Sequence, residues 1–227
     1  MKELIVNRYP KSSVTEAIKA VRTNLRFSSV NEKVRTILVT SSIAGEGKSF
    51  ISANLATTFA TAKEKVLLID CDLRRGRQQE LFNEDTHSRL GLSNLLIDDN
   101  WKKNLKDYIQ TTEITNLDII TTGSIPPNPT VLLESKKIET VMEELKSKYD
   151  VIIFDTPPVG GLTDALVMTR LADAVLIVAR AKKTTMDLLE NTKEALTNVG
   201  ANIAGVILNR VDKKDSKYYK NYYYYQD

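Results

Sequence analysis

The sequence has few of the residues that build disulfide frameworks, metal clusters or membrane spans. Its 227 residues include one cysteine, Cys71, which excludes an internal disulfide and a metal site made of cysteines alone. No apolar run approaches the roughly 18 residues that a membrane span requires, and the N-terminus MKELIVNRYP lacks the apolar core of a secretory signal. A single cysteine also fits a reducing compartment. We therefore expect a cytoplasmic protein.

The chain also lacks a strong charge imbalance. Lys and Arg number 32 and Asp and Glu 29, a formal net charge of +3, which is too small to indicate electrostatic binding of nucleic acid or membrane. The length and a hydrophobic content of 42% suit one large α/β domain. We expect a single domain over residues 1–211 and a mobile tail over 212–227, where apolar periodicity stops.

Short apolar runs alternate with amphipathic segments along the domain. The runs are rich in Val and Ile, as expected for parallel strands buried on both faces. They cover residues 36–40, 65–70, 117–121, 150–155, 174–179 and 202–208. The segments between them are long enough for crossover helices, and the clearest are 48–63, 131–148 and 184–199. The pattern predicts a doubly wound, mostly parallel α/β sheet, whose ligands bind beyond the carboxyl ends of the strands.

A further helix is predicted over residues 12–28, before the first strand. Ser13 precedes Glu16 by three residues, the spacing of a capping box that satisfies free amides at a helix N-terminus. One face of this amphipathic helix carries Glu16, Lys19, Arg22 and Arg26, which by themselves are typical of a solvated surface.

The first predicted strand ends in TSSIAGEGKS, residues 40–49, directly before a helix. Gly45 and Gly47 allow successive amides to point into one concavity, Lys48 reaches the terminal phosphates of a nucleotide, and Ser49 supplies a hydroxyl ligand for magnesium. Ser42 stands where the full P-loop pattern has its first glycine. The predicted nucleotide contacts here are Ala44, Gly45, Glu46, Gly47, Lys48, Ser49 and Phe50.

Two further strands end in aspartates. In VLLIDCDLRR, alternation along an extended chain places Asp70 and Asp72 on one side and Cys71 on the other. In VIIFDTPP, Asp155 closes a run of apolar residues. Carboxylates aimed at a phosphate site would repel the ligand unless a divalent cation lay between them, so magnesium is implied. The alternative is that these aspartates cap helices or lie on the surface.

Taken together, these motifs resemble the bacterial tyrosine kinases that regulate capsule and exopolysaccharide synthesis, P-loop NTPases related to the Min and Par proteins. The resemblance rests on SIAGEGKS as Walker A, LLIDCDLR as a second Walker A-like motif, and IIFDTPP as Walker B. It extends to the proline-containing TTGSIPPNPTVLL and to a C-terminal tyrosine cluster. The order and combination of the motifs are specific, and they span nearly the whole chain.

The resemblance implies ATP and Mg²⁺ as ligands and transfer of the γ-phosphoryl group to tyrosine. Lys48 would offset developing charge, and Ser49, Asp72 and Asp155 are the candidate metal ligands, with Asp155 in the water shell. Asp70 and Asp72 are the candidate bases, Asp70 slightly favoured by its position closer to the strand. Asn209 follows the last strand, where related P-loop proteins contact the nucleotide base.

The C-terminal segment would be the substrate. It holds six of the nine tyrosines of the chain, at Tyr218, Tyr219, Tyr222, Tyr223, Tyr224 and Tyr225. The eukaryotic kinase signatures H-R-D, D-F-G and V-A-I-K are absent, so the kinase interpretation depends on the P-loop. The family implies phosphorylation between neighbouring subunits of a ring.

Assembly and partners follow from the same resemblance. The family uses E-x-x-R-x-x-R in subunit contacts, and Glu16, Lys19 and Arg22 occupy those positions here. Lysine keeps the charge but loses the planar fork of arginine. We also expect a separate membrane activator protein of the polysaccharide machinery, an opposing tyrosine phosphatase and other protein substrates. The activator would recruit the chain to the inner face of the membrane.

Three other functions fit the sequence less well than a tyrosine kinase. A partition ATPase of the Min and Par type has a similar fold but carries a lysine at the position of Ile43. A metal-cluster carrier needs paired cysteines. Tyrosines mixed with lysines suit stacking on single-stranded nucleic acid, but that function leaves the P-loop unexplained. Arg74, Arg75 and Arg77 form either a solvated loop or a contact for phosphate or an acidic partner.

Overall fold

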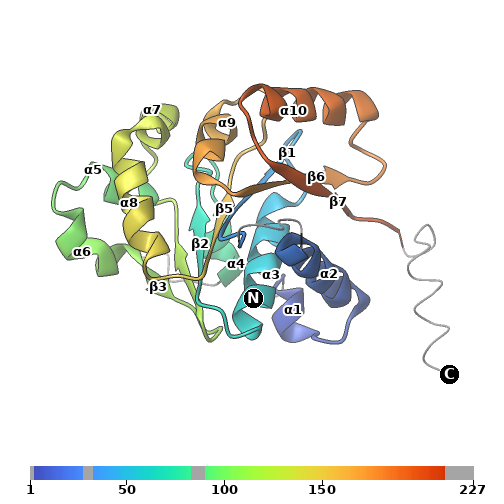
Figure 1. The fold of residues 1–227 in the computed structure, drawn as a ribbon, viewed down its shortest axis with the longest axis horizontal. Coiled ribbons are helices and arrows are strands. Elements are labelled where there is room, and N and C mark those ends of the chain that lie inside the picture. Colours follow the sequence, from blue (N-terminus) through green and yellow to red (C-terminus); the bar gives the residue numbers. More distant parts are fainter. Residues whose placement is uncertain (1–2, 28–32, 83–89, 213–227) are drawn as a thin grey trace.

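A mostly parallel sheet of seven strands organises the part of the chain that the structure, a computed structural model, describes: residues 3–27, 33–82 and 90–212. The strand order is β3-β4-β2-β5-β1-β6-β7, and only β3 runs antiparallel to its neighbour (Figure 1). The strands are β1 Thr36–Ser41, β2 Val66–Asp70, β3 Gln110–Thr111, β4 Leu117–Ile120, β5 Val151–Asp155, β6 Ala174–Arg180 and β7 Ile203–Asn209. The predicted doubly wound α/β fold is confirmed.

Helices cover both faces of the sheet (Figure 1). One layer holds α1 Ile5–Arg8, α2 Ser13–Phe27, α3 Lys48–Thr61 and α4 Gln78–Phe82. The other holds α5 Leu92–Ile97, α6 Trp101–Tyr108, α7 Pro129–Glu134, α8 Lys136–Lys146, α9 Asp164–Met168 with the 3-10 turn Thr169–Leu171, and α10 Met186–Asn198. Among the described residues, none of these helices combines the length and apolar character needed to cross a bilayer.

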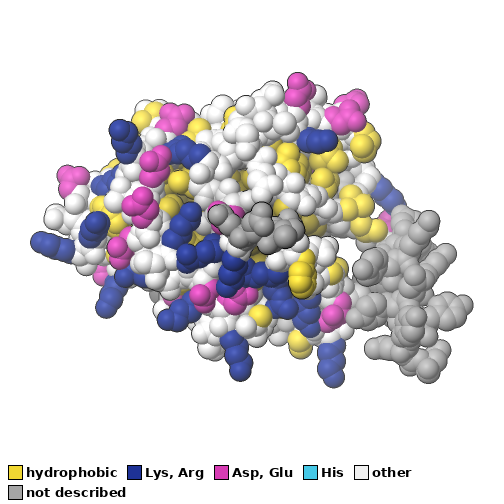
Figure 2. Space-filling view, viewed as in Figure 1, with side chains coloured by type: hydrophobic (Ala, Val, Ile, Leu, Met, Phe, Trp, Pro, Cys, Tyr) yellow, Lys and Arg dark blue, Asp and Glu magenta, His cyan; other side chains and the backbone are white. Residues whose placement is uncertain are grey.

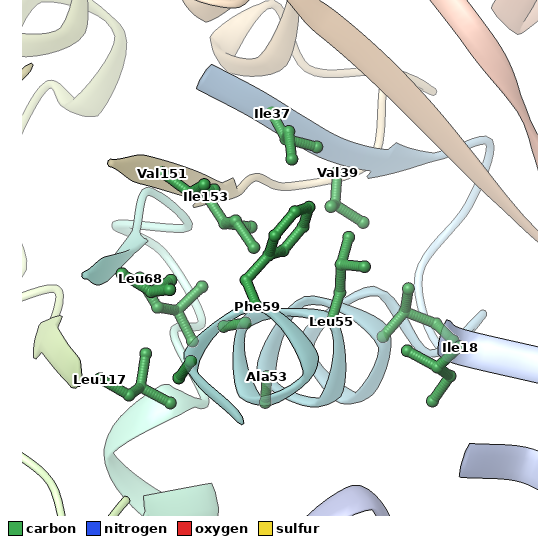
Figure 3. Packing of buried hydrophobic residues seen from close by; sticks show 14 of the residues in the cluster. Ile18, Ile37, Val39, Ala53, Leu55, Phe59, Leu68, Leu117, Val151 and Ile153 are labelled. Carbon is green, nitrogen blue, oxygen red and sulfur yellow. The ribbon is translucent and has the colours of Figure 1, made fainter. Parts of the chain in front are cut away.

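Helix α3 is the element that joins the core to the phosphate-binding loop. Its side chains Leu55 and Phe59 point toward Ile37 and Val39 of β1 (Figure 3). Leu38, between those two β1 residues, belongs to the opposite apolar layer, because side chains alternate along a strand. Burial on both faces explains why the strands are continuous apolar runs. Most of the helix is buried, which fixes the position of its first turn beside the loop.

Some local predictions were wrong in detail. The segment predicted as one helix over 131–148 forms α7 and α8, separated at Ser135, whose backbone is extended with φ −63° and ψ 147°. At the start of α2, the hydroxyl Oγ of Ser12 accepts the Thr15 amide at 3.2 Å, so the capping side chain lies one residue before the predicted Ser13. The short elements α1, α4, α5, α6, α9 and β3 were not predicted.

The carboxyl ends of β2, β5 and β1 meet at one edge of the sheet. Asp70 at the end of β2 lies in register with Asp155 at the end of β5, and Asp155 in turn lies beside Val39 of β1. Parallel neighbours end at the same edge, so residues far apart in sequence are brought together there. This edge carries the predicted site.

Candidate active site

The loop between β1 and α3 has the geometry of a phosphate cradle. Gly45 and Gly47 have φ values of 81° and 100°, in the left-handed region that favours glycine. A Cβ added at Gly47 would lie 2.1 Å from the side-chain nitrogen of Asn209, so a side chain there would also displace Asn209. The loop ends where α3 begins at Lys48, and the free amides of a helix N-terminus are suited to bind an anion.

Glu46 holds the loop from inside. Its side chain is fully buried, and Oε2 accepts the Ile43 amide at 2.9 Å. The hydroxyl of Thr184, in the turn after β6, contacts Oε1 of the same carboxylate. Glu46 was predicted to bind nucleotide. The structure turns its side chain into the loop, so only its backbone can face a ligand. Thr184 was missed, since nothing in the sequence links it to residue 46.

A cavity of about 600 Å³ opens above the loop, a volume typical of a small-molecule site. It is lined by six residues of the predicted nucleotide set in the loop and α3, together with Asn209 and Asp72. The six are Ala44, Gly45, Gly47, Lys48, Ser49 and Phe50. Basic side chains line the cavity, namely those of Lys48, Arg74, Arg75, Arg77 and Arg210. Lys and Arg also gather near the centre of the face of the molecule seen in Figure 2. Positive charge at the rim favours a phosphorylated ligand.

Asp155 lies beneath the cavity and is 1% exposed. Its Oδ2 accepts the side-chain amide of Gln78 at 2.7 Å, and its Oδ1 accepts the hydroxyl of Ser52 at 3.2 Å. Burial raises the pKa of Asp155, while hydrogen bonds from Ser49 and Gln78 and the charge of Lys48 oppose that rise. Since neutral donors occupy its oxygens, Asp155 suits contact with a metal through water.

Asp70 is equally buried and is held by the backbone. Its two oxygens accept the amides of Asp72 at 3.2 Å and Gln78 at 3.0 Å. Burial raises the pKa of Asp70 well above its usual range, and the neighbouring charge of Asp155 raises it further.

Asp72 differs from both because it lines the cavity and is partly exposed. Its Oδ1 accepts the amides of Arg74 at 3.3 Å and Arg75 at 3.0 Å, which fixes the direction of the carboxylate. Of the three predicted aspartates, Asp72 is the one that a ligand in the cavity can reach.

Two of the arginines that follow β2, Arg74 and Arg77, make different kinds of ion pair. The Nε of Arg74 donates to Oδ2 of Asp164 at 2.9 Å, and Asp164 is fully buried at the start of α9. This ion pair ties the loop that carries Asp72 to the opposite helical layer. Arg77 pairs weakly with Glu3 and Glu80, both at 3.6 Å. Asp164 was not predicted, because its partner lies 90 residues away.

The donor set fits magnesium bound mainly through a nucleotide. No cluster of three or more His, Cys, Asp or Glu residues capable of holding a metal occurs within 3–27, 33–82 and 90–212. Ser49 and Asp72 line the cavity, with Asp155 directly below. Magnesium commonly uses one or two carboxylates, water and substrate phosphates, and these residues match that requirement.

The predicted subunit contacts lie on α2, and none of the three lines this cavity. Lys19 and Glu16 form an ion pair of 2.7 Å within the helix. Arg22 donates to the carbonyl oxygen of Thr58 at 2.6 Å, which ties α2 to α3. The predicted phosphoacceptor tyrosines, residues 218–225, lie outside the described residues.

A glycine cradle at a helix N-terminus, followed by lysine and serine and flanked by strand-end aspartates, defines a P-loop nucleotide-binding protein. In agreement, the AAA domain family matches residues 34–205. The chain is 38% identical over 225 residues to CapB of Staphylococcus aureus, covering 99% of this chain and 96% of that protein. It is 37% identical over 224 residues to the tyrosine-protein kinase YwqD of Bacillus subtilis, covering 98% and 91%.

A solved structure supports the same assignment. The kinase domain of Escherichia coli tyrosine kinase ETK superposes with a TM-score of 0.86 at 35% identity, covering 94% of this chain and 82% of that one. The chain belongs to the bacterial tyrosine kinases, and it is a protein-tyrosine kinase with a P-loop nucleotide site.

The partition ATPases share the fold at greater distance. The septum site-determining protein MinD of Pyrococcus horikoshii, complexed with Mg-ADP, gives a TM-score of 0.66 at 26% identity, covering 81% of this chain and 72% of that one. Ile43 stands where a partition ATPase would carry its early loop lysine. The partition function is therefore not favoured.

Proposed function

We propose that this kinase phosphorylates the tyrosines of its own C-terminal segment, between neighbouring subunits of a ring-like homo-oligomer. The observation that carries the proposal is the position of Asn209, which lines the cavity at the end of β7. Tyr218 follows Asn209 by nine residues, a reach of at most about 30 Å when extended. The acceptor tyrosines thus follow the site closely in sequence.

The phosphate cradle supplies most of the catalysis by positioning and charge. Backbone amides of the loop would bind the ATP phosphates, and Lys48, only 8% exposed, would offset charge on the transferred group. Ser49 would hold Mg²⁺ directly and Asp155 would hold it through water, while Asp72 would join them as a ligand if Asp70 were the base. Magnesium, when bound, would offset the negative charge that develops on the leaving group.

The proposed step transfers the γ-phosphoryl group. A bond forms between a tyrosine Oη and the γ-phosphorus as the bond from that phosphorus to the β,γ-bridging oxygen breaks, and ADP leaves with the electron pair. The phenol proton passes to a carboxylate. We favour Asp72 as this base, because it lines the cavity, whereas Asp70 is 1% exposed and both its oxygens accept backbone amides. Asp70 stays the second candidate.

Transfer between subunits is tested by mixing two chains in ATP and magnesium. One is active and truncated after Asp212, and the other is full-length Lys48→Met, which cannot bind phosphate normally. We expect phosphotyrosine on the inactive full-length chain, mapped by mass spectrometry. If a separate sample of the wild-type full-length chain becomes phosphorylated but the Lys48→Met chain in the mixture does not, transfer between subunits is ruled out.

We also propose that phosphorylation regulates capsule or exopolysaccharide synthesis. Six phosphates would each add about −1.5 to −2 charges to the C-terminal segment and drive packed segments apart, which loosens the oligomer. A membrane activator protein would recruit the kinase to the inner face of the membrane, an opposing phosphatase would reset it, and other proteins would be phosphorylated as well. Equal particle size before and after phosphatase treatment would contradict the loosening.

A further inference from the structure

Gln78 connects three segments of the active site. It is the first residue of α4 and is fully buried. Its side-chain nitrogen Nε2 donates to Oδ2 of Asp155 at 2.7 Å and to the carbonyl oxygen of Ser49 at 3.2 Å. Its backbone amide donates to Oδ2 of Asp70 at 3.0 Å. One residue therefore contacts the ends of β2 and β5 and the first turn of α3.

The orientation of the Gln78 amide is fixed by these partners. A carboxylate and a carbonyl both accept, so the group that faces them must be the NH₂ group, and Oε1 points elsewhere. Oε1 is buried and receives no hydrogen bond from the described residues. A buried acceptor without a hydrogen bond destabilises the fold, so the position of Oε1 near Asp155 and Ser49 calls for a functional reason.

The backbone of Gln78 also shapes the loop that carries Asp72. The bond from its amide to Asp70 closes residues 71–77 into a tight turn. A Cβ at Gly76 in this turn would lie 2.6 Å from Oδ2 of Asp70, which leaves no room for a side chain. The turn thus fixes Asp72 relative to the sheet.

We propose that Gln78 is a positioning residue for the magnesium-nucleotide site. Its Nε2 group orients Asp155 toward the Ser49 hydroxyl, and its Oε1 accepts a hydrogen bond from a water in the magnesium shell. This inference rests on the proposed use of magnesium, but not on which tyrosine receives the phosphate. A purely structural glutamine would affect folding and nucleotide binding equally with and without the metal.

The test uses the full chain with Gln78→Met, which keeps the backbone contact and most of the volume but removes both side-chain polar groups. Affinity for a fluorescent ADP is measured in EDTA and across a magnesium titration. We expect the magnesium concentration for half-maximal enhancement to rise about 10-fold or more, with the affinity in EDTA changed less than 2-fold. The matched control is Glu80→Ala on the same helix, an exposed residue 3.6 Å from Arg77, which should match wild type.

Two results would overturn the proposal: an unchanged magnesium dependence, or an equal loss of affinity in EDTA. If Gln78→Met does not fold, as judged by circular dichroism, Gln78→Asn carries the test, since it keeps both polar groups but shortens their reach. A wild-type chain that shows magnesium-dependent ADP binding but no tyrosine phosphorylation would refute the proposed function and leave this inference intact.

Discussion

The side-chain nitrogen of Asn209 donates a hydrogen bond of 2.8 Å to the carbonyl oxygen of Glu46. The end of the edge strand β7 is thereby fastened to the phosphate loop, 163 residues earlier in the chain. Asn209 also lines the cavity, so its predicted contact with the nucleotide base stays a prediction alongside this structural role.

Replacing Asn209 with alanine should loosen the loop and weaken ADP binding about 10-fold, since a lost hydrogen bond of this kind contributes roughly 1 kcal/mol or more. Isothermal titration would measure it. Asn202→Ala is the matched control, because Asn202 Nδ2 also donates to a backbone oxygen, that of Asp173 at 2.7 Å, at the other end of β7. Equal affinities in the two variants would contradict the role of Asn209.

Thr184 should matter through its hydroxyl alone. Thr184→Val removes the contact with the buried Glu46 carboxylate and also the 2.8 Å bond from the Arg180 amide, at similar volume. We expect it to lower the free energy of unfolding by about 1–3 kcal/mol and to weaken nucleotide binding. Thr184→Ser keeps the hydroxyl and should stay near wild type in chemical denaturation. A Ser variant as unstable as the Val variant would point to packing instead.

The strand-end aspartates predict a pH effect on stability. Burial and the charge of Asp155 raise the pKa of Asp70, so the native state binds this proton more tightly than the unfolded state. The contribution of the protonated Asp70 carboxyl to the free energy of unfolding is complete below the unfolded pKa of about 3.9. It is lost as pH rises through the higher native pKa. Asp70→Asn, which lacks a titrating carboxyl, should therefore show a Tm that rises relative to wild type by about 2–4 °C as pH increases from 4 to 7, on top of a pH-independent loss from the NH₂ group that faces a backbone amide.

Asp98 provides a control of opposite sign. Hydrogen bonds from Asn100 and Asn104 lower its pKa, so its contribution is present above the unfolded pKa and is lost as pH falls. Asp98→Asn should lose stability relative to wild type at pH 7 more than at pH 4. Parallel curves for the two variants in thermal unfolding would show that burial at Asp70 is not the cause.

Substitutions of Asp72 and Asp155 should have different effects, the first on phosphoryl transfer and the second on magnesium binding. Asp72→Asn is expected to lower the phosphorylation rate about 10²–10⁴-fold with a smaller change in ADP affinity, because a general base contributes mainly to transfer. Asp155→Asn should mainly raise the magnesium requirement. Rates would be followed with ³²P-ATP. A phosphorylation rate of Asp72→Asn equal to that of wild type would instead support Asp70 as the base.

Charge on α2 should control assembly. Arg22→Glu is expected to leave monomers in size-exclusion chromatography, and mixing it with a Glu16→Arg chain should restore larger particles. Because Arg22 also donates to Thr58 within its own chain, melting temperatures of the single variants must first show that the fold is kept. Monomers in the mixture as well as in the single variants would argue against a contact between these two residues.

Much of the site was predictable because its residues are close in sequence. The loop 44–50 and the aspartates at 70 and 72 lie next to strands that are buried on both faces, and such strands are continuous apolar runs. The phosphate cradle needs glycine where φ is positive, and that requirement is visible in the letters themselves. The short helices α4, α5 and α6 were missed because packing against the sheet stabilises them more than local propensity does.

The sequence alone determined the class of fold, the position of the P-loop and the family. Only the tertiary structure decided how the loop is held and which aspartate a ligand reaches. Glu46 turns inward because Thr184 lies beside it, and Gln78 joins Asp155 across 77 residues. Such contacts form where parallel strands end at one edge, and pairings between distant segments leave no periodic trace in the chain.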